Sequence, residues 1–423
     1  MMWNKQGSVT IYVLLFFLTL VSMLMTFVNV SKTLAVGSVS SELALLWSDN
    51  ILAEYDRNLQ SRYNLFAYYG TEKSASDLID YYAEETFGGK SYLSYEGSTC
   101  VLYDYKLRTV SEMKKQVIAA GKLAALSRLS GKPGTITGLA GAEKGGNVMT
   151  DLPSAGCGSS WKARQIVDML KNTDRISTMI RHGTDPYFEN RYILHYFKNA
   201  MNDHALGATH LNQEMEYILC GKPSDSENQK SVKRRIIAIR LALNLWYLET
   251  DPKRSSELLA AAELLTPGPA APATQAAMAS AWAMAESVND YKLLINGRKI
   301  PIIKTESTWA ISLNNITGKA KVHPKHDSEG TEQNEEQTVS FPKETPLVDM
   351  DTPYGENYED YLSLMTYMMD EDVKLLRMMD LIQMNMRDQY YAGFRIEDYN
   401  TGIRTSLKVN GKDYTVERRY ERQ

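Results

Sequence analysis

The residues with the greatest capacity for chemistry are the histidines and the acidic side chains near them. Three of the six histidines share one stretch of the chain with three glutamates: His195, His204, His210, Glu189, Glu214 and Glu216. If the fold brought such a set together, it could bind a metal ion or supply a general base. The spacing does not match HExxH, and no cysteine stands beside a histidine to complete a metal site. The pattern therefore favours ordinary core or surface histidines, and it predicts no metal and no cofactor.

Other signatures of catalysis do not occur in the sequence. There is no GxSxG nucleophile elbow, no GxxxxGK(S/T) phosphate loop and no strand-coupled GxGxxG. His323 and His326, in HPKH, lie within a polar stretch that is typical of a solvated loop. Adjacent acids such as Glu84 and Glu85 belong on solvated helix faces. The sequence thus predicts a protein that is not an enzyme.

Arg240 and Asn244 are the polar residues with the most unusual setting. They lie one helical turn apart in SVKRRIIAIRLALNLWYLETD, the most hydrophobic segment outside the N-terminus. This segment is too short and too charged to cross a membrane, so it predicts a central core helix. Buried polar groups need partners. A buried structural network is favoured here over a ligand site.

Composition and cysteine usage set further limits. The formal net charge is -4 with scattered basic residues, which argues against nucleic-acid binding. Cys100, Cys157 and Cys220 include no CxxC pair, so a zinc or redox site is not indicated. One disulfide with a remaining thiol is possible outside the cytoplasm, but three buried or unpaired thiols are favoured.

The N-terminus provides the strongest topological signal. No charged side chain lies between Lys5 and Lys32, and residues 10–30 form an apolar run long enough, at about 20 residues, to span a bilayer. An uncleaved single-pass anchor is the prediction, since signal-peptide apolar regions are usually shorter, at ~7 to 15 residues. Cleavage after Gly37 is the alternative. Lys5 favours a cytoplasmic N-terminus, which places the bulk of the chain outside the cell membrane.

The segment after the span predicts an amphipathic stem helix that continues to about residue 66. One helical stripe carries the side chains predicted to dock onto the protein's own domain: Leu43, Trp47, Ile51, Tyr55, Leu59, Tyr63 and Phe66. Gly37 and Ser38 mark the expected kink. Without a break, a helix over 8–66 would be on the order of 85 to 90 Å long.

The remaining pattern predicts a mainly helical α+β fold. Helices are expected at 74–87, 110–129, 161–180, 190–202, 231–251 and 357–387, with an alanine-rich pair on either side of Pro267, Pro269 and Pro272. The helix at 74–87 would begin with Ser74 and Asp77 as a capping box. Strands are expected at 99–107, 215–220 and 298–304, and a hairpin around Asn410-Gly411.

The same pattern predicts four parts of the chain. These are an N-terminal transmembrane anchor (1–37), the stem with a first α+β part (38–130), a glycine-rich linker or loop (131–160) and a main extracytoplasmic α+β domain (161–423). Within the last part, a polar, patternless stretch at 317–345 predicts a mobile excursion.

Several segments also carry a resemblance to a known family. GSVTIYVLLFFLTLVSMLMTFVNVSKTLAV, LWSDNILAEYDRNLQSRYNLFAYYG, EYILCGKPSDSENQKSVKRRIIAIRLALNLWYL, AWAMAESVNDYKLLINGRKIPIIKTESTW and RMMDLIQMNMR resemble uncharacterised membrane-anchored proteins of Gram-positive bacteria. The genes of those proteins accompany tight-adherence (Tad, Flp-type) pilus genes. The resemblance implies a partner among pilus or secretion proteins, but it implies no activity.

The N-terminus is also similar to the TadE and TadG pseudopilins. Their signature is a glycine at a processing site, followed by an apolar helix with a glutamate five residues past the glycine. Here Gly7 and Ser8 would form the processing site, but Tyr12 occupies the glutamate position. The resemblance therefore supports partnership with such an apparatus better than polymerisation into a filament.

These observations predict a non-enzymatic, membrane-anchored extracytoplasmic protein that serves as a structural or assembly component of a Tad-like pilus or secretion apparatus. Its contacts would be membrane lipid, through the N-terminal helix, and proteins of the apparatus. The main alternative is a membrane-tethered enzyme of the cell wall or of protein processing, which a cluster of Glu214 with a histidine in an open pocket would support. A ligand sensor is a third hypothesis, without any cytoplasmic output domain.

Overall fold

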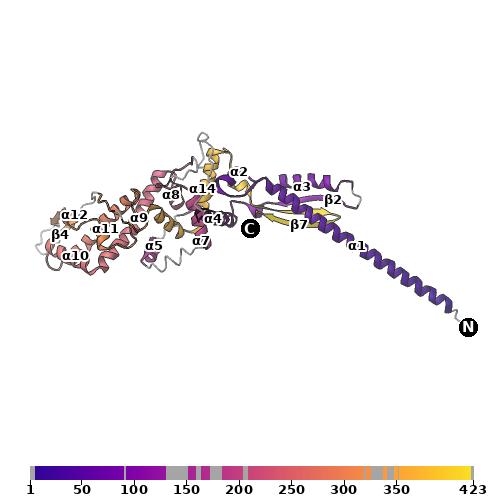
Figure 1. Cartoon of the computed structure of the whole chain (residues 1–423), viewed down its shortest axis with the longest axis horizontal. Helices are drawn as coiled ribbons and strands as arrows, with labels where there is room; N and C mark the ends of the chain where they lie inside the picture. Colours follow the sequence, from indigo (N-terminus) through magenta and orange to yellow (C-terminus); the bar gives the residue numbers. More distant parts are fainter. Residues whose placement is uncertain are drawn as a thin grey trace, which may run out of the picture. The chain divides into compact units, whose positions relative to one another are not determined.

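The structure is a computed structural model that divides the chain into two compact units (Figure 1). It describes residues 5–89, 92–129, 151–158, 163–171, 183–202, 208–318, 321–324, 337–340, 347–350 and 352–420. The first unit comprises Met1–Met113 and Arg395–Gln423, and the second comprises Lys114–Phe394. This division differs from the boundaries expected at 38–130 and 161–423, because the C-terminal strands pair with a strand of the N-terminal part. Most described residues are helical, as predicted for a mainly helical α+β protein.

The first unit begins with one long helix, α1 (Lys5–Ala53). The expected kink at Gly37 and Ser38 is wrong, since α1 runs through both positions without a break. The expected continuation to residue 66 is also wrong. At about 1.5 Å per residue, the 49 residues of α1 are about 74 Å long.

A capping residue explains where the stem ends. The Asp56 carboxylate accepts hydrogen bonds from the backbone N–H groups of Asn58 and Leu59, at 2.8 and 3.0 Å. This cap starts a separate short helix, α2 (Arg57–Tyr63). Tyr399 also donates its hydroxyl to Asp56, at 2.8 Å, which holds the break against strand β5 (Tyr399–Asn400). Spacing alone could not reveal the break, because α2 continues the apolar stripe in helical rhythm.

The sheet of the first unit has the order β2-β6-β7, with both neighbouring pairs antiparallel. Its strands are β2 (Tyr95–Val101), β6 (Gly402–Val409) and β7 (Lys412–Arg419). A second, two-stranded sheet pairs β1 (Tyr68–Tyr69) with β5. The predicted hairpin is confirmed: Asn410 and Gly411 have φ of 52° and 70°, the left-handed values that a type I′ turn requires.

The strand predicted at 99–107 begins and ends earlier in the chain, as β2. After β2 the chain enters a 3-10 helix, η1 (Tyr103–Tyr105). Cys100 and Leu102 are buried, whereas Thr99 is exposed. The inward face follows from pairing, because Cys100 lies opposite Thr405 of β6 on the side of the sheet that α1 covers.

The neighbouring helix α3 (Glu72–Phe87) begins two residues before the predicted start. Its capping box pairs Thr71 with Ser74, and not Ser74 with Asp77. A further 3-10 helix, η3 (Ile396–Asp398), precedes β5.

The described part of the second unit is formed almost entirely of helices. The described helices of eight or more residues are α4 (Val110–Leu129), which begins in the first unit, α5 (Ala163–Leu170), α7 (Asp185–Tyr196), α9 (Asp225–Thr250), α10 (Pro252–Leu265), α11 (Ala271–Ile295), α13 (Tyr358–Tyr367) and α14 (Glu371–Gln389). Shorter elements are α8 (Glu214–Cys220), η2 (Glu306–Thr308), α12 (Asn314–Thr317), β3 (Lys321–Pro324) and β4 (Gln337–Ser340).

The predictions at α4, α9 and the alanine-rich pair α10 and α11 are confirmed. Gly297 ends the second of that pair with a φ of 77°. The helix predicted at 190–202 lies earlier, as α7. Only the start of the helix predicted at 161–180 is seen, as α5, and the part from 172 lies outside the described residues.

Three other predictions in the second unit are wrong. The strand expected at 215–220 is helix α8, whose seven residues are all buried, so no alternation could distinguish the two states. At 298–304 there is a single bridge, from Ile300 to Glu356, and no strand. The helix expected at 357–387 is divided into α13 and α14, because Asp370 caps the second helix by accepting from Val373 N–H.

The segment predicted to be a linker or loop, 131–160, and the predicted mobile excursion, 317–345, both fall largely outside the described residues. Within 131–160, residues 151–158 are described and lie against α14, where Asp380 accepts from Ser154 N–H at 2.9 Å and Gln383 donates to the Asp151 carbonyl at 2.9 Å. Within 317–345, the described residues include β3 and β4, which pair as antiparallel strands.

Candidate functional site

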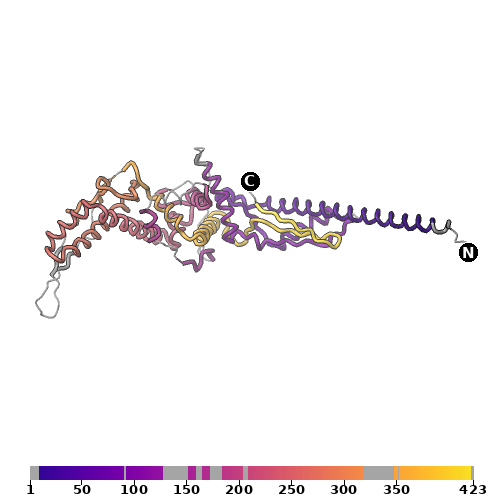
Figure 2. The backbone as a smooth tube through the Cα atoms, turned by 90° about the horizontal axis from the view of Figure 1, so that it is seen from below, coloured from indigo at the N-terminus to yellow at the C-terminus, as the bar shows by residue number. Residues whose placement is uncertain are grey.

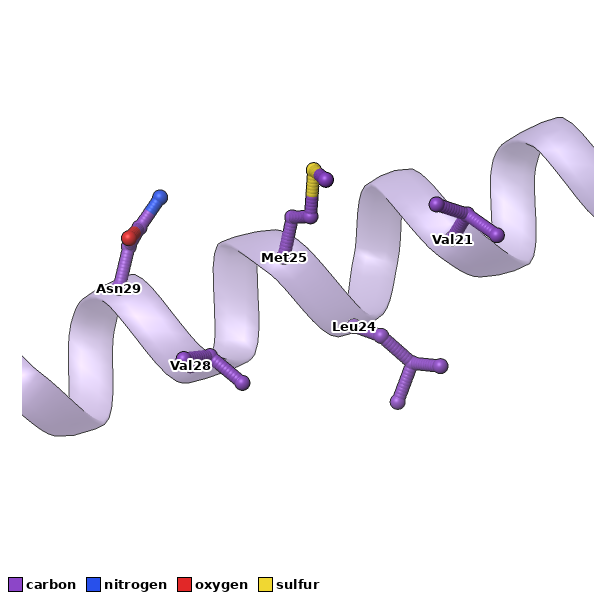
Figure 3. Close-up of a pocket in the computed structure, with 5 residues that line it drawn as sticks. All are labelled: Val21, Leu24, Met25, Val28 and Asn29. Carbon is purple, nitrogen blue, oxygen red and sulfur yellow. The ribbon is translucent and has the colours of Figure 1, made fainter.

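The first candidate surface is the N-terminal half of α1. From Val9 to Val30 its large apolar side chains are exposed, with 64% exposure at Val9 and 52% at Val30. Among the described residues this is the one helix long and apolar enough to cross a membrane. Figure 3 shows Val21, Met25 and Asn29 projecting from the helix with no other segment in view. A groove between such side chains is a surface that lipid can fill.

The C-terminal half of the same helix forms the core of the first unit. Figure 2 shows the β6–β7 hairpin running beside this half of α1. Trp47 and Ile51 are buried with Ile403 and Leu407 of β6. One helix is therefore exposed and apolar in its first half and packed against a sheet in its second.

Polar contacts fix this packing at several levels. The hydroxyl oxygens of Ser48 and Thr405 lie 2.8 Å apart, and both side chains are fully buried. Asp49 forms an ion pair with Arg418 of β7, with N and O atoms 3.1 Å apart. Tyr420 donates its hydroxyl to the Leu52 carbonyl, near the end of α1.

The structure places the predicted stem residues on two helices. On α1, Trp47 and Ile51 are in the core, and Leu43 packs partly buried against it. On α2, Leu59 and Tyr63 are buried at 0% and 1% exposure.

The other two stem residues lie at the break and beyond α2. Tyr55 and Phe66 are half-buried, with ring centroids 4.9 Å apart, and both rings contact Tyr420 near the C-terminus. The whole stripe thus packs within its own unit.

The two glycines considered as cleavage sites differ in setting. Gly7 and Ser8 lie in the first turns of α1. Gly37 lies where β7 approaches the helix closely: a Cβ added there would be 3.0 Å from Cε1 of Tyr414. The absence of a side chain at Gly37 therefore permits close packing, and it does not produce the expected kink.

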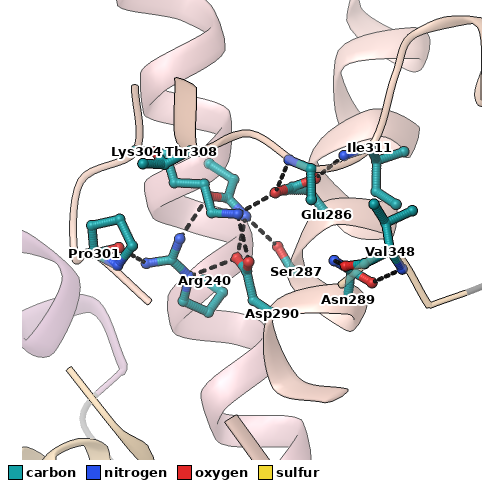
Figure 4. A network of polar contacts seen from close by, with 12 residues as sticks. Arg240, Glu286, Ser287, Asn289, Asp290, Pro301, Lys304, Thr308, Ile311 and Val348 are labelled. Atoms are coloured by element: carbon teal, nitrogen blue, oxygen red, sulfur yellow. Dashed lines mark hydrogen bonds and ion pairs between the residues drawn. The ribbon is translucent and has the colours of Figure 1, made fainter. Parts of the chain in front are cut away.

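The second candidate is a buried polar network in the second unit (Figure 4). Arg240 of α9 donates to Asp290 of α11 at 2.9 Å, to Asn244 at 3.1 Å and to the Ile302 carbonyl at 2.8 Å. Lys304 forms ion pairs with Glu286 and, at 2.6 Å, with Asp290. The prediction that Arg240 and Asn244 join a buried network is confirmed.

The charges of this network balance, with two cations and two carboxylates whose side chains are fully buried. Burial alone opposes the charge on Arg240, but Tyr361 and Asp290 raise its pKa above the ordinary value. Burial also opposes the charge on Asp290, but Arg240 and Lys304 lower its pKa. A closed, neutral set of this kind can join helices, but no substrate can reach it.

Asp290, Glu286 and Lys304 were not singled out from the sequence. The available signal was the spacing of Glu286 and Asp290, which places two acids one turn apart on a largely apolar, alanine-rich helix. The sequence around Lys304 has no comparable pattern, since only the tertiary fold brings Lys304 close to Glu286 and Asp290.

Among the described residues, the histidines and glutamates that the alternative of a catalytic cluster requires do not form an open site. His210 pairs with Asp388, with Nδ1 and Oδ2 2.8 Å apart. Glu214 is fully buried, and it accepts from Lys198 N–H at 2.9 Å and from the Asn385 amide at 2.6 Å. Asn385 also accepts from His210 N–H, so it links the two residues through its amide. Both Glu214 oxygens are thus engaged in the interior.

The remaining candidates are dispersed. His195 packs on the Tyr196 ring, with centroids 4.7 Å apart. Glu189 pairs with Lys374, and Glu216 accepts from Tyr358. His204 and the side chains of His323 and His326 lie outside what the structure describes. No group of three metal-ligating side chains occurs among the described residues.

The three cysteines are free thiols, two of them buried. Burial raises the pKa of Cys100 and of Cys220. Cys157 is half-buried, in the segment against α14.

The comparisons with known proteins bear on the family and not on an activity. No curated protein and no solved structure matches the chain. A family model matches residues 107–411, which include the whole second unit and strand β6. The chain belongs to DUF5702, a family of unknown function.

Proposed function

We propose that the protein is a non-enzymatic, single-pass membrane protein that serves as a structural or assembly component of a Tad-like pilus or secretion apparatus. The observation that carries this proposal is the continuity of α1. The helix extends unbroken from its exposed apolar half into the core of the first unit. A rigid element of this kind fixes a folded body at the membrane, as a component of an assembly requires.

The packing of Val36 supports retention of the anchor. Val36 is 6% exposed and belongs to the core cluster that α1 forms with the sheet. Cleavage after Gly37 would remove this side chain and begin the mature chain inside a packed helix. With the anchor retained, the bulk of the protein would lie on the extracytoplasmic side of the membrane and Lys5 on the cytoplasmic side.

The assignment to a pilus or secretion apparatus rests on the resemblance of the N-terminus and of the internal segments quoted above. The anchor supplies the contact with lipid, and the surfaces of the folded units supply contacts with proteins of the apparatus. No nucleic acid is expected as a partner, given the net charge of -4.

A flexible insertion tests whether α1 acts as a rigid support or only as a tether. Six glycine and serine residues would be inserted between Lys32 and Thr33, which lie in the exposed part of α1 before Val36. The matched control places the same insertion after Gly268, in the exposed turn between α10 and α11. Each variant would replace the native gene, and piliation and recovery in the membrane fraction would be measured.

We expect the insertion after Lys32 to leave the protein in the membrane but to reduce piliation to the level of a gene deletion. The control should support normal piliation. A membrane-tethered enzyme would tolerate both insertions, because a flexible connection to the membrane is sufficient for it. Unchanged piliation in the deletion strain, with no apparatus component co-purifying with the solubilised protein, would refute the proposal.

A further inference from the structure

The second unit contains a partly enclosed cavity of about 160 Å³ that nothing above assigns a role. Its lining comes from α5, α7, α13 and the segments around Ile302 and Glu356. A dry cavity of about 150 Å³ can hold a benzene molecule, so this one suits a ligand on the order of six non-hydrogen atoms. Its polar lining includes one cation, Arg191, and two carboxyl groups, Glu356 and Asp360.

Among the residues that the structure describes, Arg191 is in no ion pair with a carboxylate, and no group accepts a hydrogen bond from its buried Nε. The guanidinium lies over the Tyr187 ring, 5.1 Å from its centroid, which orients it without neutralising it. A half-buried guanidinium whose Nε has no partner among the described residues is suited to a carboxylate, which it can bind through two parallel hydrogen bonds.

The two carboxyl groups, Glu356 and Asp360, are suited to a cation. Burial, followed by the charge of Asp360, raises the pKa of Glu356, and the charge of Lys299 opposes this shift without cancelling it. Asp360 also accepts from the backbone N–H of Asn357 at 2.9 Å, which holds it in place as the third helical residue of the capping box that Asn357 begins at α13. Two adjacent carboxyl groups need a shared proton or a cation, and an ammonium group can take that position.

The rest of the lining is held firmly. The Tyr361 hydroxyl and the Ile302 carbonyl accept from Arg240, whose guanidinium belongs to the network in Figure 4. Asn190 is engaged by Ser363 and Thr366. Leu170 and Leu364 supply apolar surface. The cavity is therefore preformed, with opposite charges that are not paired with each other.

We propose that this cavity binds a small zwitterion, namely a free α-amino acid with a short side chain. The ligand carboxylate would contact Arg191, the ammonium group would contact Glu356 and Asp360, and the side chain would lie against Leu170 and Leu364. This inference concerns the second unit alone and does not depend on the proposed function.

Three probes that share a methyl group test the requirement for both charges. L-alanine carries both, ethylamine lacks the carboxylate, and propionate lacks the ammonium group. Saturation-transfer-difference NMR on the full-length protein in detergent micelles would follow the methyl resonance of each during titration. We expect L-alanine to bind at least about tenfold more tightly than either single-charge probe, since each charge-assisted contact is worth about that factor. L-tryptophan, which exceeds the cavity, should give no competition.

Two variants test the assignment of the charges. Arg191→Gln should weaken L-alanine binding at least about tenfold and leave ethylamine binding unchanged, whereas Glu356→Gln should weaken L-alanine and leave propionate unchanged. A general disturbance of the fold would weaken both probes alike. Arg298→Gln, which breaks a surface ion pair with Asp349, is the matched control and should have no effect.

The proposal is overturned if L-alanine gives no saturable signal, or if either single-charge probe binds as tightly as L-alanine. It is also overturned if Arg298→Gln weakens binding as much as Arg191→Gln. If a variant fails to fold, as judged by circular dichroism, the comparison of probes on the unmodified protein still decides the question.

Discussion

The side-chain oxygens of Ser48 and Thr405 lie 2.8 Å apart, although 357 positions separate the two residues in sequence. Ser48 also lies 2.7 Å from the Ala44 carbonyl, to which it donates. Thr405 therefore donates to Ser48. This buried bond joins the helix that carries the apolar N-terminal half to the central strand of the sheet.

Replacement of Ser48 tests how strongly this bond stabilises the first unit. Ser48→Ala should reduce the free energy of unfolding by about 1 to 3 kcal/mol, because the Thr405 hydroxyl is left buried without its acceptor. In the double variant Ser48→Ala/Thr405→Val, the loss should be smaller than the sum of the two single losses. Urea unfolding of the solubilised protein, followed by circular dichroism, measures the losses in the single and double variants. Ser61→Ala, on the exposed face of α2, is the control. If the losses of Ser48→Ala and Thr405→Val were additive in the double variant, this would contradict the pairing.

The buried network of the second unit makes a different prediction for Asp290. Asp290→Asn leaves Arg240 and Lys304 with one carboxylate between them, so it should destabilise the protein by about 3 to 5 kcal/mol. Asp349→Asn breaks the exposed pair with Arg298 and should change stability by only about 0 to 1 kcal/mol. Thermal unfolding of the two variants gives the comparison. Equal effects would mean that the interior pair is solvated.

The thiols provide a third test, which also checks that they are unpaired. Burial and the raised pKa of Cys100 and Cys220 both reduce the fraction of accessible thiolate. In the native protein at about pH 8, near the ordinary thiol pKa, iodoacetamide should therefore modify Cys157 first. Mass spectrometry of peptides after timed labelling gives the three rates. In urea the rates should converge, and a cysteine that stays unmodified there without reductant would indicate a disulfide.

The parts of the fold that could be predicted are those with a strong local signal. The Asn410-Gly411 turn needs two residues in the left-handed region, and this requirement is visible in two letters. The α9 segment is long and apolar, and the buried Arg240 could be expected to find partners. Its particular partners could not be predicted, because Asp290 and Lys304 reach it only through the tertiary fold.

Element boundaries failed where a cap or a pairing partner competed with periodicity. Asp56 ends the stem helix, and Asp370 divides the helix predicted at 357–387. In the sequence, both look like ordinary surface acids. The inward face of β2 depended on Cys100 lying opposite Thr405, which is about 300 positions away. The cavity around Arg191 could not be predicted from the sequence, since its charged residues come from α7, from the start of α13 and from the residues just before α13.

The mature N-terminus is the most informative single measurement on the native protein. We expect the protein from washed membranes to retain the apolar half of α1, because Val36 and the close contact at Gly37 belong to the packed core. Intact-mass spectrometry distinguishes a full-length chain from one that starts at Ser8 or at Ser38. Ala35→Arg, which removes the small-x-small pattern before Ser38, should leave the mass unchanged apart from the substitution itself. A chain that starts at Ser38 would contradict the anchor, since the docked half of α1 would then be held by the sheet alone and the protein would leave the membrane in carbonate.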